Sequence, residues 1–228
     1  MGVELFPGFR RVDRTAFDAA IAAAPLTELM RQQYARYSPN DYDGWDGPDY
    51  RIHDGDLIVD GHLNNVGFNT LVTGSITATG LVDLRNPHTE PNNHGFDEGG
   101  LFMSAGDITC RALGGEGGKC TFIDGDLRAS DFILNGFGNS SIVVSGRLTT
   151  RLFLGHDIWA EVGNGADLEY GIGYCLPIGY TNASSQAINP QHTQQQSIAA
   201  LVFAYDNDRN LEPFYEAALK GRSVFQEA

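Results

Sequence analysis

The stretch HDGDLIVDG, residues 53–61, places one histidine and three carboxylates around a short apolar segment. Acidic, basic and metal-ligating side chains gathered in this way could form a catalytic or metal site. The same residue types are also typical of tight turns on either side of a short strand. The choice between a site and a turn depends on whether the pattern occurs once or recurs along the chain.

The Gly-x-(Leu/Ile) part of this pattern recurs at a nearly constant spacing. The glycines that begin a copy are Gly55, Gly74, Gly106, Gly125, Gly146 and, in a degenerate sixth copy, Gly165. The first five are 19, 32, 19 and 21 residues apart, and the long interval contains RNPHTEPNNHGFDE, residues 85–98. That polar stretch is rich in turn-forming residues and indicates a loop insertion. Short apolar segments on both sides of each glycine, repeated about every 20 residues, indicate stacked β-coils.

The sequence therefore predicts a mostly β protein, a short right-handed parallel β-helix (β-solenoid) of five or six coils. We expect an N-terminal helical cap and an acidic-aromatic linker over residues 1–52. The solenoid is expected over residues 53–180, with its insertion at 85–98, and a C-terminal cap over residues 181–228. With one strand spacing of ~4.8 Å per coil, the rod would be roughly 25 Å long.

Both ends of the chain carry helical patterns. Residues 14–37 have apolar residues on one helical face, Pro25 interrupts the run, and Thr27 is a candidate N-cap for the second piece. A further short helix is expected over residues 211–220, with Gly221 as its stop. An uncapped solenoid end exposes unpaired backbone groups. We therefore expect the first helices to cover the open first coil and the last helix to close the last coil.

One repeat position holds Asp56, Asp107 and Asp126, and Ser75 and Arg147 stand there in other coils. A position that varies in this way is typical of an exposed corner, where Asp and Ser bond nearby backbone N–H groups. The alternative is a ladder of carboxylates ~5 Å apart, of the kind that solenoid lyases and glycosidases use. No cluster of Lys or Arg lies beside these carboxylates, so the structural interpretation is favoured.

Two histidine-containing stretches are candidate metal sites. His53, Asp60 and His62 have no equivalents in the other repeats, so a site there remains open. His88 and His94 stand near carboxylates in the insertion and could bind a divalent metal. Neighbouring Pro and Asn residues predict an ordinary polar loop instead, and no histidine pair has helical i, i+4 spacing. We predict no metal and no cofactor, and favour a partner-contact role for the insertion.

The cysteines and the glycine-rich segment predict no chemistry. Cys110, Cys120 and Cys175 form no CxxC pair, and their odd number is no disulfide framework. No histidine signature accompanies Cys110 or Cys120, so both are predicted to be buried small hydrophobes. The segment GGEGGK, residues 114–119, lacks the ending of a phosphate-binding loop and is expected to be a turn between strands.

The net charge of −14 argues against nucleic acid or an anionic membrane as a partner. It is compatible with a basic protein partner, with cations or with solubility alone. Residues 53–169 hold sixteen Asp and Glu but six Lys and Arg. The N-terminal segment lacks a signal pattern, and no apolar run reaches a membrane-spanning length, so a cytoplasmic location is expected.

The run DYDGWDGPDY, residues 41–50, interleaves carboxylates with aromatic rings. Carboxylates pair with Arg or Lys, and aromatic side chains supply desolvated anchors at interfaces, so this run suits a basic protein surface. The alternative is a linker whose aromatic rings pack on the first coil. The residues predicted to contact a partner are Asp41, Tyr42, Asp43, Trp45, Asp46 and Asp49 in this run and Glu90, Asp97 and Glu98 in the insertion.

The repeats and the C-terminal segment resemble a family of bacterial cytoplasmic β-solenoid proteins labelled polymer-forming or bactofilin-like. The similar stretches are residues 54–61, 71–76, 106–108, 125–127 and 211–225. Some proteins of this kind stand beside polymorphic toxins, in the position of immunity proteins. The resemblance implies a solenoid fold, whereas the insertion and the Gln-rich stretch 186–197 depart from the pattern.

These observations favour an immunity (antitoxin-like) protein, not an enzyme, which binds a basic cognate toxin and blocks its active site. The alternative is a bactofilin-like filament subunit, which would need exposed coil ends for head-to-tail stacking, so the expected caps speak against it. A carbohydrate-active β-helix enzyme is the third interpretation. We expect a monomer or a small oligomer.

Overall fold

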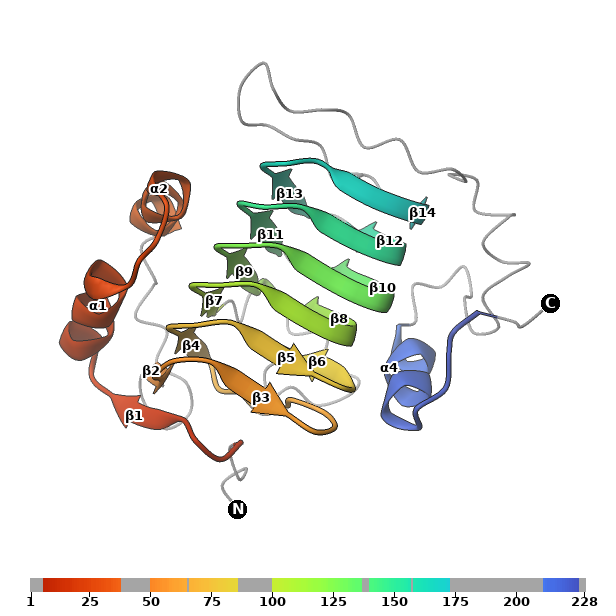
Figure 1. Ribbon diagram of the computed structural model, residues 1–228, viewed down its shortest axis with the longest axis horizontal. Coiled ribbons are helices and arrows are strands. Elements are labelled where there is room, and N and C mark those ends of the chain that lie inside the picture. The colour runs from red at the N-terminus through yellow and green to blue at the C-terminus, as the bar shows by residue number, and fades with distance from the viewer. Residues whose placement is uncertain are drawn as a thin grey trace.

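The structure, a computed structural model, describes residues 6–37, 50–64, 66–85, 100–136, 140–156, 158–172 and 211–225. Within these residues, short strands wind into a β-solenoid flanked by helices on two sides (Figure 1). The strands of successive coils pair in parallel, as the repeat spacing predicts, so the predicted mostly β solenoid is confirmed.

Two sheets form the walls of the solenoid, here called sheet A and sheet B. Sheet A contains, in spatial order, β1 (Arg10–Val12), β2 (Tyr50–His53), β4 (Asn69–Val72), β7 (Leu101–Ser104), β9 (Cys120–Ile123), β11 (Ser141–Val144) and β13 (Trp159–Val162). Sheet B contains β3 (Leu57–Val59), β5 (Ile76–Ala78), β8 (Ile108–Glu116), β10 (Leu127–Gly136), β12 (Leu148–His156) and β14 (Ala166–Ile172). β6 (Leu81–Asp83) pairs with the second half of β8.

The leucine or isoleucine of each repeat forms one buried column inside sheet B. In register, these residues are Leu57, Ile76, Ile108, Leu127 and Leu148. The sixth copy is offset by one residue, because Ala166 pairs with Leu148 and the Gly165 carbonyl accepts the Leu148 N–H. Gly165 therefore takes the position of Arg147 and not that of Gly146.

The long strands β8, β10 and β12 continue past sheet B into a third face of the solenoid. In β10 the register shifts between Ala129 and Phe132, which marks the bend from one face to the next. A third apolar segment of the repeat, residues 129–134, forms the bend and the second half of β10. The prediction that residues 114–119 form a turn is wrong in part. Residues 114–116 belong to β8, and the turn is formed by Gly117 and Gly118, which have positive φ.

The N-terminal helices α1 (Arg14–Ala23) and α2 (Glu28–Tyr37) cover the outer face of sheet A. Thr27 is the N-cap of α2, since its Oγ1 accepts the Met30 N–H at 3.4 Å, as predicted. Thr27 also donates its hydroxyl to Asp124 at 2.7 Å, at the end of a middle strand of sheet A. The helices do contact the first coil, where Phe17 packs on Tyr50, but their apolar faces also extend along several further coils of sheet A.

The edge of the first coil in sheet A is covered by a strand instead. β1 pairs with β2 in antiparallel orientation, with Arg11 opposite Arg51. Phe6 and Phe9 lie beside the first coil and pack against the solenoid core. Residues before the first helix, whose pattern gave no strand signal, therefore protect the backbone groups that β2 would expose.

The C-terminal helix α4 (Glu212–Leu219) lies against the third face. Its predicted stop is confirmed, because Gly221 has φ +68° and its N–H bonds the Ala218 carbonyl. The expectation that this helix closes the last coil is wrong, since Phe214 and Tyr215 pack on β6, β8 and β10 in the middle of the rod (Figure 1). The apolar side chains that point outward from the third face require this cover.

The ring of Tyr215 packs against the backbone of β8 at Gly114, which explains the glycine at that position. A Cβ at Gly114 would lie 2.7 Å from Tyr215 Oη, whereas a Cβ at Gly115 would have no heavy atom nearer than 3.7 Å. We expect Gly114→Ala to destabilise the protein by roughly 1–3 kcal/mol through overpacking. Gly115→Ala is the matched control and should cost less than about 1 kcal/mol. Urea unfolding of both variants measures the difference, and equal losses would contradict this contact.

Candidate functional site

One face of the solenoid carries no helix among the described residues. Helices α1 and α2 cover sheet A, and α4 covers the third face. The first halves of the sheet B strands expose their outward side chains, and these define the open face. Its central column, in register from the first coil to the sixth, is Ile58, Thr77, Thr109, Arg128, Thr149 and Asp167.

The repeated aspartates form the corner that borders the open face. Asp56 Oδ1 accepts the backbone N–H of Ser75, and Asp107 Oδ1 accepts that of Asp126, both at 2.8 Å. Asp126 Oδ1 accepts the N–H of Arg147 at the same distance. Each carboxylate thus bonds the equivalent residue of the next coil. The structural interpretation of these aspartates is confirmed, with the refinement that their partner lies one coil further on.

The repeated glycines are explained by the same contact. A Cβ at Gly106 would lie 2.5 Å from Ser75 Oγ, and one at Gly125 would collide with the Asp107 carboxylate. Neither of these two glycines has a positive φ, so backbone freedom is not the reason for them. Glycine is required because the side chain of the preceding coil occupies the space that a Cβ would fill.

The two histidines of the first coil also make structural contacts. His53 directs Nδ1 at the Gly8 carbonyl at 3.1 Å and Nε2 at the Asp56 carbonyl at 3.2 Å. His62 Nδ1 accepts the Leu81 N–H of the next coil at 2.9 Å. The imidazole thus makes, at the corner after β3, the same kind of contact between coils that Asp56 makes at the corner before β3. The two imidazoles therefore orient backbone and do not face a common centre.

The other carboxylates of this stretch have separate partners as well. Asp54 forms an ion pair with Arg10 at 2.8 Å, which lowers the pKa of Asp54 through the hydrogen bond from the guanidinium. Asp60 accepts a hydrogen bond from the Thr79 hydroxyl at 3.2 Å. Among the described residues, no group of three or more His, Cys, Asp or Glu side chains could hold a metal ion. The open question about residues 53–62 is answered by turn and corner contacts.

Arginine side chains on the open face pair with carboxylates of the same face. Arg147 lies 3.1 Å from Asp167, and Arg151 lies 2.7 Å from Glu169 in the next coil. Arg128 contacts Asp126 of its own coil. These ion pairs were not predicted. The repeat itself contained part of the signal, because the residues three positions after each of the first five repeat glycines, Arg128 among them, form the central column of the open face.

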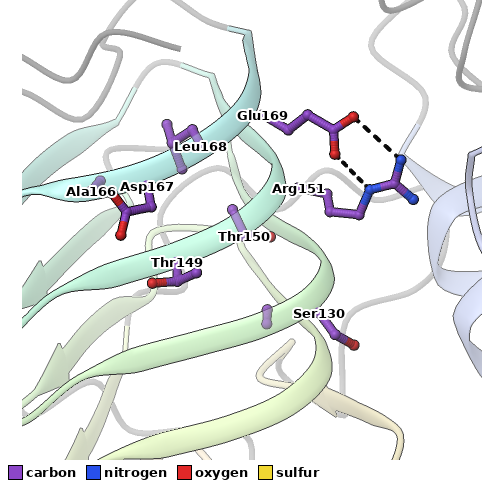
Figure 2. A pocket seen from close by; sticks show the side chains of 9 residues that line it. Ser130, Thr149, Thr150, Arg151, Ala166, Asp167, Leu168 and Glu169 are labelled. Atoms are coloured by element: carbon purple, nitrogen blue, oxygen red, sulfur yellow. Dashed lines mark hydrogen bonds and ion pairs between the residues drawn. The ribbon is translucent and has the colours of Figure 1, made fainter. Parts of the chain in front are cut away.

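A shallow groove of about 610 Å³ lies at the far end of the open face, across β10, β12 and β14 (Figure 2). It is lined by Ala129, Ser130, Thr149, Thr150, Arg151, Ala166, Asp167, Leu168 and Glu169. In Figure 2 the Arg151–Glu169 ion pair stands at one side of the groove. The Thr150 hydroxyl donates to the backbone carbonyls of Asp131 and Leu152. The lining holds no histidine or cysteine, so it offers hydrogen bonds and charge but no nucleophile with an adjacent base.

Two of the cysteines are buried, as predicted. Cys110 and Cys120 are free thiols, and burial raises the pKa of Cys110 to about 12. A thiol in this state is a packing group and not a nucleophile at neutral pH. Cys175 lies outside the described residues.

All nine residues predicted to contact a partner lie outside the described residues, as do His88 and His94. The described residues show where their segments join the fold. Residues 38–49 lead into β2, and residues 86–99 lead into β7, two strands away in sheet A. Tyr50, the last residue of the acidic-aromatic run, is buried with its ring 5.1 Å from that of Phe17.

The geometry defines a β-solenoid whose carboxylate corners are structural. No protein-family model, curated protein or solved structure matches the chain. In the part of the chain that the structure describes, no helix is long and apolar enough to cross a membrane.

The corner contact predicts a graded effect of substitution at Asp107. Asp107→Ala removes the acceptor for the Asp126 N–H and should lower the free energy of unfolding by about 1 kcal/mol. Asp107→Asn keeps an acceptor oxygen and should lose less than half of that. Asp167→Ala, which removes only an exposed ion pair, is the control and should cost under ~0.5 kcal/mol. Chemical unfolding measures the free energy of unfolding of all three variants. Equal losses in the three would show that the Asp107 contact does not stabilise the fold.

Proposed function

We propose that the protein is a binding protein of the immunity (antitoxin) type, which acts in the cytoplasm and occludes the active site of a basic protein toxin. The acidic-aromatic run, residues 41–50, and the insertion, residues 85–98, would make the contact, and they lie largely within the segments 38–49 and 86–99. The observation that carries this proposal is the position at which both segments join the rigid solenoid.

The two segments enter sheet A at neighbouring positions. Arg51, Thr70 and Phe102 are in register in β2, β4 and β7, so the strand starts that follow the two segments are two strand spacings apart. This separation is roughly 10 Å. Two segments attached so close together can contact one partner at the same time, and the rigid scaffold lowers the entropy that binding would cost.

The composition of the segments supports a basic partner. Together they hold seven Asp and Glu residues and no Lys or Arg, which is half of the net charge of −14. The arginines of the open face, in contrast, are paired with carboxylates. Carboxylates attract a cationic surface, and interleaved aromatic rings supply anchors once it is bound.

The filament alternative finds less support in the contacts of the first coil. Head-to-tail stacking would require β2 to present a free edge to another copy. β1 occupies that edge in antiparallel orientation. The enzyme alternative depends on a carboxylate ladder free to reach a substrate, and Asp56, Asp107 and Asp126 each bond a backbone N–H of the next coil.

The test is calorimetric titration of the purified protein with the product of the neighbouring gene, at about 50 and about 500 mM NaCl. We expect a complex that weakens with salt. Replacing Asp41, Asp43, Asp46 and Asp49 with Asn should weaken it at least tenfold, because four ion pairs of ~0.4 kcal/mol each would be lost.

The matched control changes four carboxylates elsewhere, Glu28, Asp167, Glu169 and Glu216, to their amides. This control alters the net charge equally and should change the affinity less than threefold. Equal losses in both variants, or the absence of a complex, would overturn the proposal. Sedimentation of the protein alone as long polymers would replace it with the filament function.

A further inference from the structure

The first coil has a second edge, in sheet B, and it differs from the covered edge in sheet A. β3 is the terminal strand of sheet B, and no described strand pairs with its outer side. The Leu57 N–H bonds the Ser75 carbonyl, and the Val59 carbonyl accepts the Thr79 N–H. Backbone groups alternate sides along a strand, so those of Ile58 point away from β5 and toward the outer side.

The side chain of Ile58 is unusual for its position. It is 82% exposed, and the equivalent positions in the other coils hold Thr, Arg or Asp. Asp56 and Asp60 flank β3 at its two ends, and each accepts a hydrogen bond from the second coil, Asp56 from the Ser75 N–H and Asp60 from the Thr79 hydroxyl. No ion pair involves either carboxylate among the described residues, whereas the adjacent Asp54 pairs with Arg10.

From this arrangement we infer that β3 is a docking edge for an extended basic segment of another protein. The segment adds one strand to sheet B and bonds the free N–H and C=O groups of Ile58. An apolar side chain lies opposite Ile58, and Lys or Arg side chains two residues before and after it lie opposite Asp60 and Asp56. This edge is separate from residues 38–49 and 86–99, and the inference holds whether or not those segments bind a toxin.

The same carboxylates disfavour an antiparallel pair between β3 and the β3 strand of a second copy. An antiparallel β3–β3 pair centred on Ile58 would place Asp56 of one copy opposite Asp60 of the other at both ends. Like charges directly opposite each other destabilise a strand pair. A short edge strand flanked by carboxylates therefore resists self-association and selects a cationic strand.

The probe is the peptide acetyl-Lys-Thr-Val-Thr-Lys-amide, titrated into the ¹⁵N-labelled protein and followed by backbone amide chemical shifts. We expect saturable shifts centred on Ile58 and its neighbours, and an affinity that falls with salt. The control peptide acetyl-Glu-Thr-Val-Thr-Glu-amide, of equal length and apolar content, should bind at least tenfold more weakly because its charges repel Asp56 and Asp60.

Variants of the edge complete the test. Asp56→Asn with Asp60→Asn keeps the acceptor oxygens for Ser75 and Thr79 and should weaken the Lys peptide at least fivefold. The matched control is Asp107→Asn with Asp167→Asn, two carboxylates away from the edge, which should leave affinity within twofold. Ile58→Thr, the residue of the next coil, should weaken binding and preserve the fold.

Several results would overturn the inference. They are equal binding of the two peptides, shifts that map away from β3, equal losses in the edge and control variants, or no binding at millimolar concentration. If the double Asn variant fails to fold, the comparison of the two peptides on the unaltered protein still decides the question. Loss of toxin binding with peptide docking intact would refute the proposed function and leave this edge site standing.

Discussion

The fold depends on a close contact between coils, in which an aspartate carboxylate accepts the backbone N–H of the next coil. The carboxylates of Asp56, Asp107 and Asp126 make this contact at 2.8 Å, and glycine stands in the following coil because a Cβ would occupy the same space. The repeat therefore selects two residue types together. A charged side chain that looks available for catalysis is already committed to holding neighbouring coils in register.

The helices of this protein protect the sides of the rod and not its ends. Sheet A and the third face both direct apolar side chains outward, and these surfaces would be exposed without α1, α2 and α4. The open face needs no cover because Thr77, Thr109 and paired arginines occupy it. Burial of outward apolar columns, which the hydrophobic effect favours in proportion to area, thus decides where each helix lies.

The charged side chains fall into two groups, those that form ion pairs within the solenoid and those that do not. Arg147 and Arg151 of the solenoid are paired with carboxylates one coil away. Asp56 and Asp60 of the first coil form no ion pair among the described residues, and the two segments that join sheet A contain seven further carboxylates. The negative potential is therefore concentrated near a few places from which a cationic partner would be attracted.

The sequence alone determined the repeat, the parallel solenoid, the corner role of the aspartates, the burial of Cys110 and Cys120 and the helix signals at Thr27 and Gly221. All of these follow from local chemistry that recurs at a fixed period. Only the tertiary structure decided that β1 covers the first coil, that the helices lie on the sides, and that His62 replaces an aspartate. Those features depend on contacts between residues distant in sequence. An amphipathic pattern predicts that a helix packs on the solenoid, but it does not say whether the helix lies at an end or on a side of the rod. The position of Ile58 at an uncovered edge likewise required knowing which strand is last in its sheet.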